Sequence, residues 1–158
     1  MVNVSKTFTD GHKALSNINI KIDNGEFVFL VGASGAGKST LIKLILKETE
    51  ADQGTILINN RDVTRMKRRD IPFLRRSIGV VFQDFRLLQE KTVYENVAFA
   101  MEVIEAPPKD IRRQVPIVLS LVGLSKKSGL YPSQLSGGEQ QRVSLARAMV
   151  NGPSILIA

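Results

Sequence analysis

The stretch GASGAGKST, residues 32–40, decides the fold of this chain. It matches the pattern G-x-x-x-x-G-K-[ST]. An apolar run suited to a buried strand, EFVFLV (26–31), precedes it, and an amphipathic segment suited to a helix, KSTLIKLILKE (38–48), overlaps its end. A strand, a glycine-rich turn and a helix in this order indicate a phosphate-binding loop rather than an ordinary turn.

The residues of this loop suit a nucleoside triphosphate and a magnesium ion. Its glycines let backbone N–H groups turn toward a phosphate, and the helix that follows adds its positive end. Lys38 would reach the β- and γ-phosphates, and the Ser39 hydroxyl would coordinate Mg²⁺. The expected binding residues of the loop are Gly32, Ser34, Gly35, Ala36, Gly37, Lys38, Ser39 and Thr40.

Short strands are expected on both sides of this loop. VNVSKTF (2–8) and INIKI (18–22) flank a turn signal at Asp10 and Gly11, and their alternation predicts a half-exposed antiparallel sheet. GTILINNRDV (54–63) predicts a hairpin around Asn59 and Asn60, and IGVVFQ (78–83) predicts a second buried strand. The fold class is therefore α/β, in a single domain over residues 1–158.

The pattern becomes helical from about residue 84 to 135, which predicts a helical subdomain inserted into the α/β core. Helices are expected at TVYENVAFAMEVI (92–104) and KDIRRQVPIVLSLVGL (109–124), where Pro116 would kink or delimit the second helix. GGEQQRVSLARAMV (137–150) predicts a further helix, which leads to a terminal apolar strand, ILIA (155–158).

Composition excludes several kinds of site. The chain has no cysteine and a single histidine, His12, which leaves neither disulfides nor a zinc cluster, and His12 is expected to be merely exposed in a turn. No apolar run approaches the ~20 residues that span a bilayer, and no leader opens the chain. These features predict a cytosolic, soluble protein.

The net charge of +7 is concentrated in RDVTRMKRRDIPFLRR (61–76). This stretch suits a solvated basic face and a docking surface equally well. It lacks the interleaved aromatic residues of a platform for single-stranded nucleic acid.

LSGGEQQR, residues 135–142, supplies a second candidate anion site. Ser136 can cap the helix that follows, and Gly137 and Gly138 leave its first N–H groups open. A lone S-G-G is more often only a helix cap. Two phosphate-binding helix starts in one small domain require two ligands, or two chains that share one ligand.

With these motifs the chain resembles the ATP-binding cassette (ABC) ATPases over nearly its whole length. The resemblance implies a P-loop NTPase core with an N-terminal antiparallel β subdomain and an inserted helical signature subdomain. It also implies a head-to-tail homodimer on ATP binding, in which residues of one copy contact the γ-phosphate held by the other. Those residues are Ser136, Gly137, Gly138 and Glu139.

Two further residues gain a role from the resemblance. Gln83, at the end of IGVVFQ, matches the position whose side chain contacts Mg²⁺ and the attacking water, so that Gln83 and Lys38 are the expected catalytic residues. Phe8 matches the aromatic residue that stacks on adenine, where the family more often has Tyr. Without the resemblance, Phe8 would be assigned to the core.

Within the family, residues 74–103 and the signature are similar to the members that act in cell division. That similarity implies an integral membrane partner and a place on the cytoplasmic face of the membrane, with Phe85, Leu87, Leu88 and Tyr94 in a partner groove or in the core. ATPases of lipoprotein release or macrolide export are the alternative. DNA-associated relatives are disfavoured, because the chain has no cysteine and no heptad run, and no nucleic acid partner is expected.

The resemblance also bears on the terminal strand. In the family, the strand written here as ILIA continues into an Asp-Glu pair, which holds Mg²⁺ and polarises the attacking water. We therefore expect the 158 residues to be a fragment without the C-terminal core strands. We expect the full-length parent to hydrolyse ATP and this chain alone to be inactive.

Overall fold

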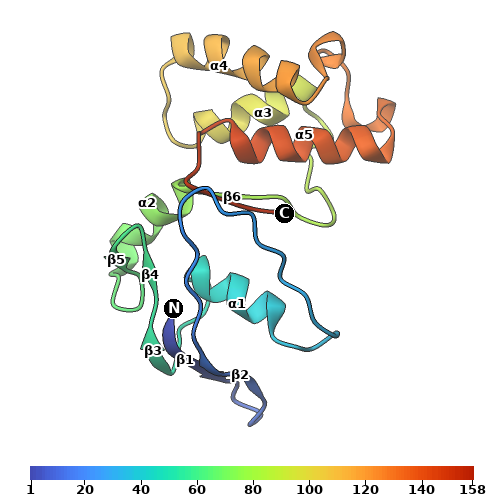
Figure 1. Ribbon diagram of the computed structural model, residues 1–158. Coiled ribbons are helices and arrows are strands. Elements are labelled where there is room, and N and C mark those ends of the chain that lie inside the picture. The colour runs from blue at the N-terminus through green and yellow to red at the C-terminus, as the bar shows by residue number, and fades with distance from the viewer. The chain divides into compact units, whose positions relative to one another are not determined.

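The computed structural model describes residues 1–158, which form two compact units, Met1–Ile71 and Pro72–Ala158 (Figure 1). The first unit is built on an antiparallel sheet with the strand order β2-β1-β3. Its strands are β1 (Val2–Thr7), β2 (Lys13–Ile18) and β3 (Gln53–Thr55). Helix α1 (Lys38–Ile45) follows the glycine-rich loop, as expected, and packs beside β2.

The turn between β1 and β2 decides the register of the sheet. Gly11 has a φ of 82° and donates its N–H to the Phe8 carbonyl at 2.9 Å, which confirms the predicted turn. Because this turn is short, pairing begins with Thr7 opposite Lys13, and Ile18 is already opposite Val4. Strand β2 ends at Ile18, so the expectation of a strand at 18–22 is wrong, although Ile20 still exchanges backbone hydrogen bonds with Met1.

The predicted hairpin at Asn59 and Asn60 is confirmed. Strands β4 (Leu57–Ile58) and β5 (Arg61–Asp62) pair on either side of these two residues. Both asparagines have positive φ values, 49° and 61°, which is the backbone of a type I′ turn and is easier for Asn than for most residues.

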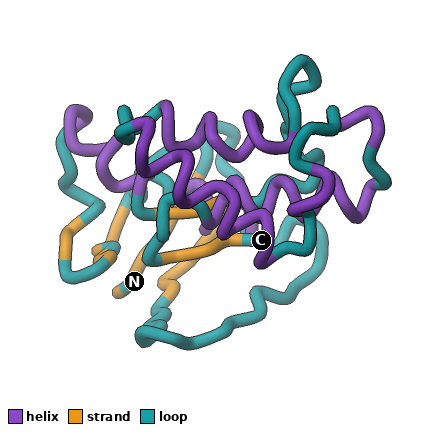
Figure 2. The backbone as a smooth tube through the Cα atoms, turned by 90° about the horizontal axis from the view of Figure 1, so that it is seen from above, coloured by secondary structure: helices purple, strands orange, loops and turns teal.

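The predicted strand at 26–31 is absent, and this expectation is wrong for the structure. Figure 2 draws the connection between β2 and α1 as loop. Phe27, Phe29 and Val31 are 84%, 78% and 83% exposed, and the two phenylalanine rings contact each other at 5.0 Å. A continuous apolar run forms a stable strand only when other strands flank it and both faces are covered. Here no strand pairs with residues 26–31.

The second unit combines a parallel strand pair with a layer of helices. β6 (Ile78–Val80) pairs with β7 (Ile155–Ile157), with Gly79 opposite Leu156, so both predicted strands are present, although β6 ends three residues before Gln83. A Cβ at Gly79 would lie 2.4 Å from the Ala148 carbonyl oxygen, which shows how closely the strand and the helix behind it approach. A short helix, α2 (Ile71–Arg76), precedes β6.

Three helices pack on one another beside this strand pair (Figure 1). They are α3 (Val93–Glu102), α4 (Pro108–Leu121) and α5 (Gly137–Met149). The fully buried side chains of their common core include Val97, Val115, Leu119, Val143 and Ala146. Pro116 lies inside α4 on its exposed side and does not end the helix, which continues to Leu121. No helix in the structure combines the length and apolarity that crossing a membrane requires.

Candidate nucleotide-binding site

A pocket of about 350 Å³ lies at the start of α1 in the first unit. The β1–β2 hairpin forms one wall, and the glycine-rich loop with the first turn of α1 forms the other. Its lining residues are Phe8, His12, Ala14, Ser34, Gly35, Gly37, Lys38, Ser39 and Thr40. The lining contains one lysine, one histidine and no acidic residue, so its electrostatics suit an anionic ligand.

Two glycines allow the loop to reach this shape. Gly35 and Gly37 have φ values of 80° and 86°, which residues with a Cβ rarely adopt. Gly37 is also crowded, because a Cβ there would lie 2.4 Å from the Ala14 carbonyl oxygen and 2.8 Å from Leu15 Cδ2. Gly37 therefore seats the loop directly against β2, while its own carbonyl accepts the first bond of α1, from the Leu41 N–H.

Lys38 bends back over the loop that precedes it. Its Nζ donates to the carbonyl oxygens of Gly32 and Ala33 at 2.6 and 2.8 Å. These bonds hold the ammonium group beside the loop backbone, although no carboxylate neutralises it. A phosphate in the pocket would offer stronger, charged acceptors to the same ammonium group. Gly32 and Ala36 belong to the loop but do not line the pocket.

The structure brings Phe8 to the pocket from the end of β1. The adjacent backbone is tied down, because the Thr7 N–H and Lys6 Nζ both donate to the Asp52 carboxylate, at 2.6 and 2.9 Å. The hydrogen bonds from Lys6 and then Thr7 hold the pKa of Asp52 below its usual value. Lys6 Nζ also lies 6.0 Å from the centroid of the Phe8 ring.

His12 also lines the pocket, and the sequence interpretation missed this. The Phe8 N–H donates to the His12 carbonyl at 2.9 Å across the turn, so both residues line the same pocket. A usable signal was present, since residues on either side of a tight turn lie next to each other.

Gln83 lies in a β-turn of the second unit. The turn is closed by the Phe85 N–H, which donates to the Phe82 carbonyl at 3.0 Å, so Gln83 occupies its second position. The side chain is exposed and its amide makes no hydrogen bond within the chain. The group is therefore free to contact a ligand.

Ser136 is the N-cap of α5, as its sequence position suggested. Its N–H donates to Glu139 Oε2 at 2.9 Å, which is one half of a capping box. Gly137 and Gly138 are exposed, and a Cβ at either would meet no atom closer than 3.9 Å. As residues of the first turn, they have N–H groups without an acceptor inside the helix.

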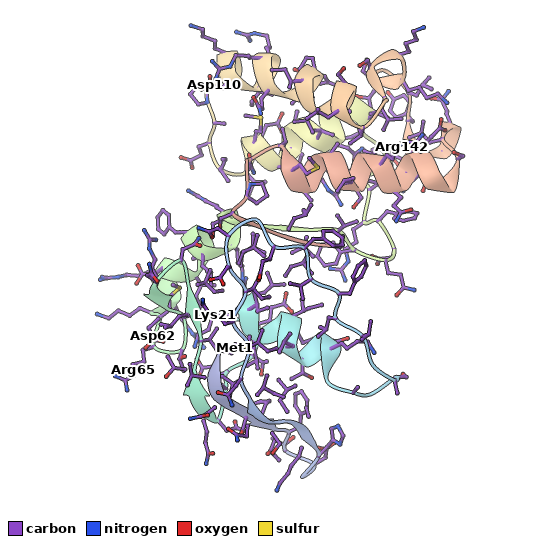
Figure 3. All side chains as sticks on the ribbon, viewed as in Figure 1. Met1, Lys21, Asp62, Arg65, Asp110 and Arg142 are labelled. Atoms are coloured by element: carbon purple, nitrogen blue, oxygen red, sulfur yellow. The ribbon has the colours of Figure 1, made fainter.

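The Glu139 carboxylate is paired with basic side chains of the same chain. Lys127 Nζ lies 2.5 Å from Glu139 Oε1, and Arg142, labelled in Figure 3, lies at 4.0 Å from the same oxygen. The hydrogen bond from Lys127, followed by the bonds from the Ser136 N–H and hydroxyl, lowers the pKa of Glu139 to about 2. The carboxylate is therefore charged at neutral pH and complements the positive end of α5.

The residues assigned to a partner groove lie largely in the helical core. Leu87 is buried, and Phe85 and Tyr94 pack against the same core, which favours the structural alternative for them. The basic residues of 61–76 are exposed, as both a solvated face and a docking surface require. Arg65, next to Asp62 in Figure 3, is 90% exposed, and the distance from its Nε to Asp62 Oδ2 is 4.0 Å.

Comparisons with known proteins identify relatives over the whole chain. A family model described as ABC transporter matches residues 15–158. The cell division ATP-binding protein FtsE of Bacillus subtilis (strain 168) is 55% identical over 158 residues, which cover 100% of this chain and 69% of that protein. FtsE of Escherichia coli is 50% identical over 155 residues, which cover 98% of this chain and 70% of that protein.

Solved structures give the same result for the fold. A dimeric ATP-binding cassette in a post-hydrolysis state, bound to ADP and Pi, matches with a TM-score of 0.82 and 35% identity, over 98% of this chain and 70% of that one. CbiO1 from Clostridium perfringens, part of an ABC transporter complex, matches with a TM-score of 0.91 and 32% identity. The match covers 98% of this chain and 62% of that chain. The predicted P-loop NTPase fold is thereby confirmed.

Proposed function

Because the chain belongs to the ABC transporter family, we propose that it is the ATP-binding subunit of a complex that drives a membrane partner in bacterial cell division. The observation that carries the ATP-binding part of this proposal is the pocket, in which an aromatic ring, two glycines with positive φ and Lys38 meet without any acidic residue. The names of its relatives, cell division ATP-binding proteins, support the process.

In this proposal the pocket holds ATP. The ring of Phe8 stacks on adenine, for which any aromatic face serves. The N–H groups of the loop from Gly32 to Thr40 surround the phosphates, and Lys38 exchanges its two carbonyl acceptors for β- and γ-phosphate oxygens. His12 stands beside Phe8 and is a further contact for the nucleotide.

Mg²⁺ fits the same site. No cluster of three or more acidic, histidine or cysteine side chains is present to hold a metal alone. Mg²⁺ does not need one, because it is commonly held by phosphate oxygens, waters and one or two protein groups. The Ser39 hydroxyl lines the pocket, so we propose it as a ligand of the ion. From the family resemblance alone, we propose Gln83 of the second unit as a further ligand. When bound, Mg²⁺ would neutralise charge on the phosphates.

We further propose that two copies close around ATP head to tail. The open glycines at the start of α5 support this, since Ser136, Gly137 and Gly138 present uncovered polar groups to an anion. Glu139 would contribute through the charge and position of the capping box. One related solved structure is a dimer with ADP and Pi, which agrees with this arrangement.

The partner that we propose is an FtsX-like integral membrane protein, which would hold the subunit at the cytoplasmic face of the membrane. We treat residues 1–158 as one ATP-binding domain that includes the helical segment 84–135. The alternative partner is a transporter of lipoprotein release or macrolide export. Co-purification of the complete gene product with each type of membrane protein would separate these alternatives. We expect no nucleic acid partner.

The nucleotide proposal is tested by replacing Lys38. In the complete gene product, we expect Lys38→Ala to weaken binding of a fluorescent ATP analogue roughly 10- to 100-fold, because a charged hydrogen-bond donor to the phosphates is lost. Lys43→Ala is the matched control, since Lys43 is on α1 but outside the pocket. Equal affinities of the Lys38 and Lys43 variants would remove the basis of the proposal.

A further inference from the structure

Arg147, near the C-terminal end of α5, binds the backbone that follows Gln83. Its Nη1 donates to the Arg86 carbonyl and its Nη2 to the Phe85 carbonyl, both at 2.6 Å. These contacts join residues more than sixty positions apart in the sequence. Arg147 is in no ion pair with a carboxylate, so its two carbonyl contacts are its specific bonds in this chain.

The bound backbone has an unfavourable conformation. Phe85 and Arg86 have φ values of 56° and 47°, in the left-handed region that residues with a Cβ rarely adopt. Such a conformation persists only where surrounding contacts hold it. Arg147 supplies those contacts, because its planar guanidinium can bind two adjacent carbonyls at once.

Gln83 lies between this anchor and a second one. On the N-terminal side, the Val81 N–H donates to the Ile157 carbonyl at 2.8 Å, which fixes the chain to β7. On the C-terminal side, Arg147 fixes Phe85, the residue that closes the turn. Arg86 adds a local contact, with its guanidinium 4.0 Å from the centroid of the Phe82 ring. The turn is therefore held at both ends, while the Gln83 side chain is left free.

Partial burial strengthens the bond from Arg147 to the Phe85 carbonyl, whereas its bond to the Arg86 carbonyl is exposed. The side chain is partly buried, and desolvation lowers the pKa of its guanidinium, which nevertheless stays charged at neutral pH. Charge-assisted hydrogen bonds that are shielded from water are stronger than exposed ones. A guanidinium bound in this way stabilises one position of the turn over others.

We propose that Arg147 is a positioning residue for Gln83, which ties the turn that carries Gln83 to the helix that begins with the signature residues. This inference rests on the proposed function, in which Gln83 contacts Mg²⁺ and the attacking water. Because α5 is one continuous helix, its two ends move together, so Arg147 transmits a shift of Ser136 and Gly138 to Gln83.

The test uses the complete gene product, four single variants and one double variant. Arg147→Gln removes the charge and the paired donors, and Arg147→Lys keeps the charge with a single compact donor group. Asn151→Ala is the matched control, because Asn151 also bonds a distant carbonyl, that of Ala100, at 2.9 Å, without touching the turn. Gln83→Ala and the double variant with Arg147→Gln measure the coupling between the two residues.

We expect Arg147→Gln to lower kcat for ATP by roughly 10- to 100-fold, as a displaced catalytic group does, with Kd for the ATP analogue changed by about 2-fold or less. Arg147→Lys should fall between this variant and the wild type. The double variant should lose no more than Gln83→Ala alone. Hydrogen exchange of the amides of residues 82–88 should become faster in Arg147→Gln and stay unchanged in Asn151→Ala.

The experiment distinguishes failure of the positioning role from failure of the proposed function. A wild type that neither binds nor hydrolyses ATP would refute the function itself. An active wild type in which Arg147→Gln and Asn151→Ala behave alike, or in which the losses from Gln83 and Arg147 add, would refute the positioning role. If Arg147→Gln does not fold, the kcat and the hydrogen-exchange rates of Arg147→Lys test the positioning role instead. An Arg147→Lys variant with full kcat and unchanged exchange would contradict the proposal.

Discussion

Gly37 shows how much a single position contributes to the candidate site. The residue combines a φ of 86° with a backbone neighbour that leaves no room for a Cβ. Gly35, two residues earlier, has a similar φ of 80° but nothing within 4 Å of its would-be Cβ. The pair therefore separates the cost of a left-handed backbone from the cost of a steric clash.

We expect Gly37→Ala to lower the free energy of unfolding by about 2–4 kcal/mol, because strain and a backbone clash act together. Gly35→Ala should cost only about 1–2 kcal/mol, from the left-handed conformation alone. Urea unfolding followed by circular dichroism measures both values. Similar losses for the two variants would show that contact with Ala14 does not constrain the loop.

At the scale of elements, polar side chains of the second unit close helix ends and loops. Asn96 is fully buried on α3. Its Oδ1 accepts a hydrogen bond from the Leu88 N–H, and its Nδ2 donates to the carbonyls of Leu88, Lys91 and Thr92. Thr92 and Glu95 form the capping box of the same helix. Ser136 and Glu139 form the capping box at the start of α5, and the Glu139 carboxylate is charged there.

The low pKa of Glu139 predicts a dependence of stability on pH. The folded pKa, about 2, lies below the ordinary value of 4.5, so this carboxylate stabilises the folded state above about pH 4.5 and loses that contribution as the pH falls toward 2. We expect Glu139→Gln to flatten the decline in the free energy of unfolding between pH 5 and pH 2. Urea titrations at several pH values measure this.

The control for this prediction is Lys126→Ala, compared with Lys127→Ala. Lys127 bonds Glu139, whereas its neighbour Lys126 is exposed and is in no ion pair with it. Lys127→Ala should reproduce part of the effect of Glu139→Gln, and Lys126→Ala should not. Parallel pH profiles for wild type and Glu139→Gln would show that Glu139 keeps an ordinary pKa.

At the scale of the whole molecule, the exposed apolar run at 26–31 is the largest departure from the expected fold. Its sequence has the apolar continuity of a core strand, yet Phe29 is 78% exposed. Its side chain makes one ring contact, to Phe27. Most of the stabilising burial in the first unit comes from other residues, including Val4, Leu44, Ile56 and Val63.

We therefore expect Phe29→Ser to change the free energy of unfolding of the 158-residue chain by about 0.5 kcal/mol or less, as an exposed substitution does. The same change in a packed core strand would cost roughly 3–5 kcal/mol. Binding of a hydrophobic dye should decrease in Phe29→Ser, because an exposed ring is lost. Leu44→Ala, in the core of α1, serves as the destabilising control.

The sequence by itself determined the features that depend on near neighbours. Asn59 and Asn60 predict their turn because both tolerate positive φ, Gly37 and Lys38 mark the start of α1, and Ser136 marks the start of α5. The family motifs added the candidate roles of Phe8 and Gln83, which no local pattern supplied. These features need only a few consecutive residues, so a single sequence is enough to predict them.

Only the tertiary structure decided the contacts between distant residues. It placed His12 beside the phosphate-binding loop, bonded Arg147 to Phe85 and Arg86, and left residues 26–31 unpaired. Each of these outcomes depends on which elements come together, and the apolar pattern of a strand does not name its neighbours. The physical reason is that burial and pairing are properties of the assembled chain, whereas turn and cap preferences belong to the residues themselves.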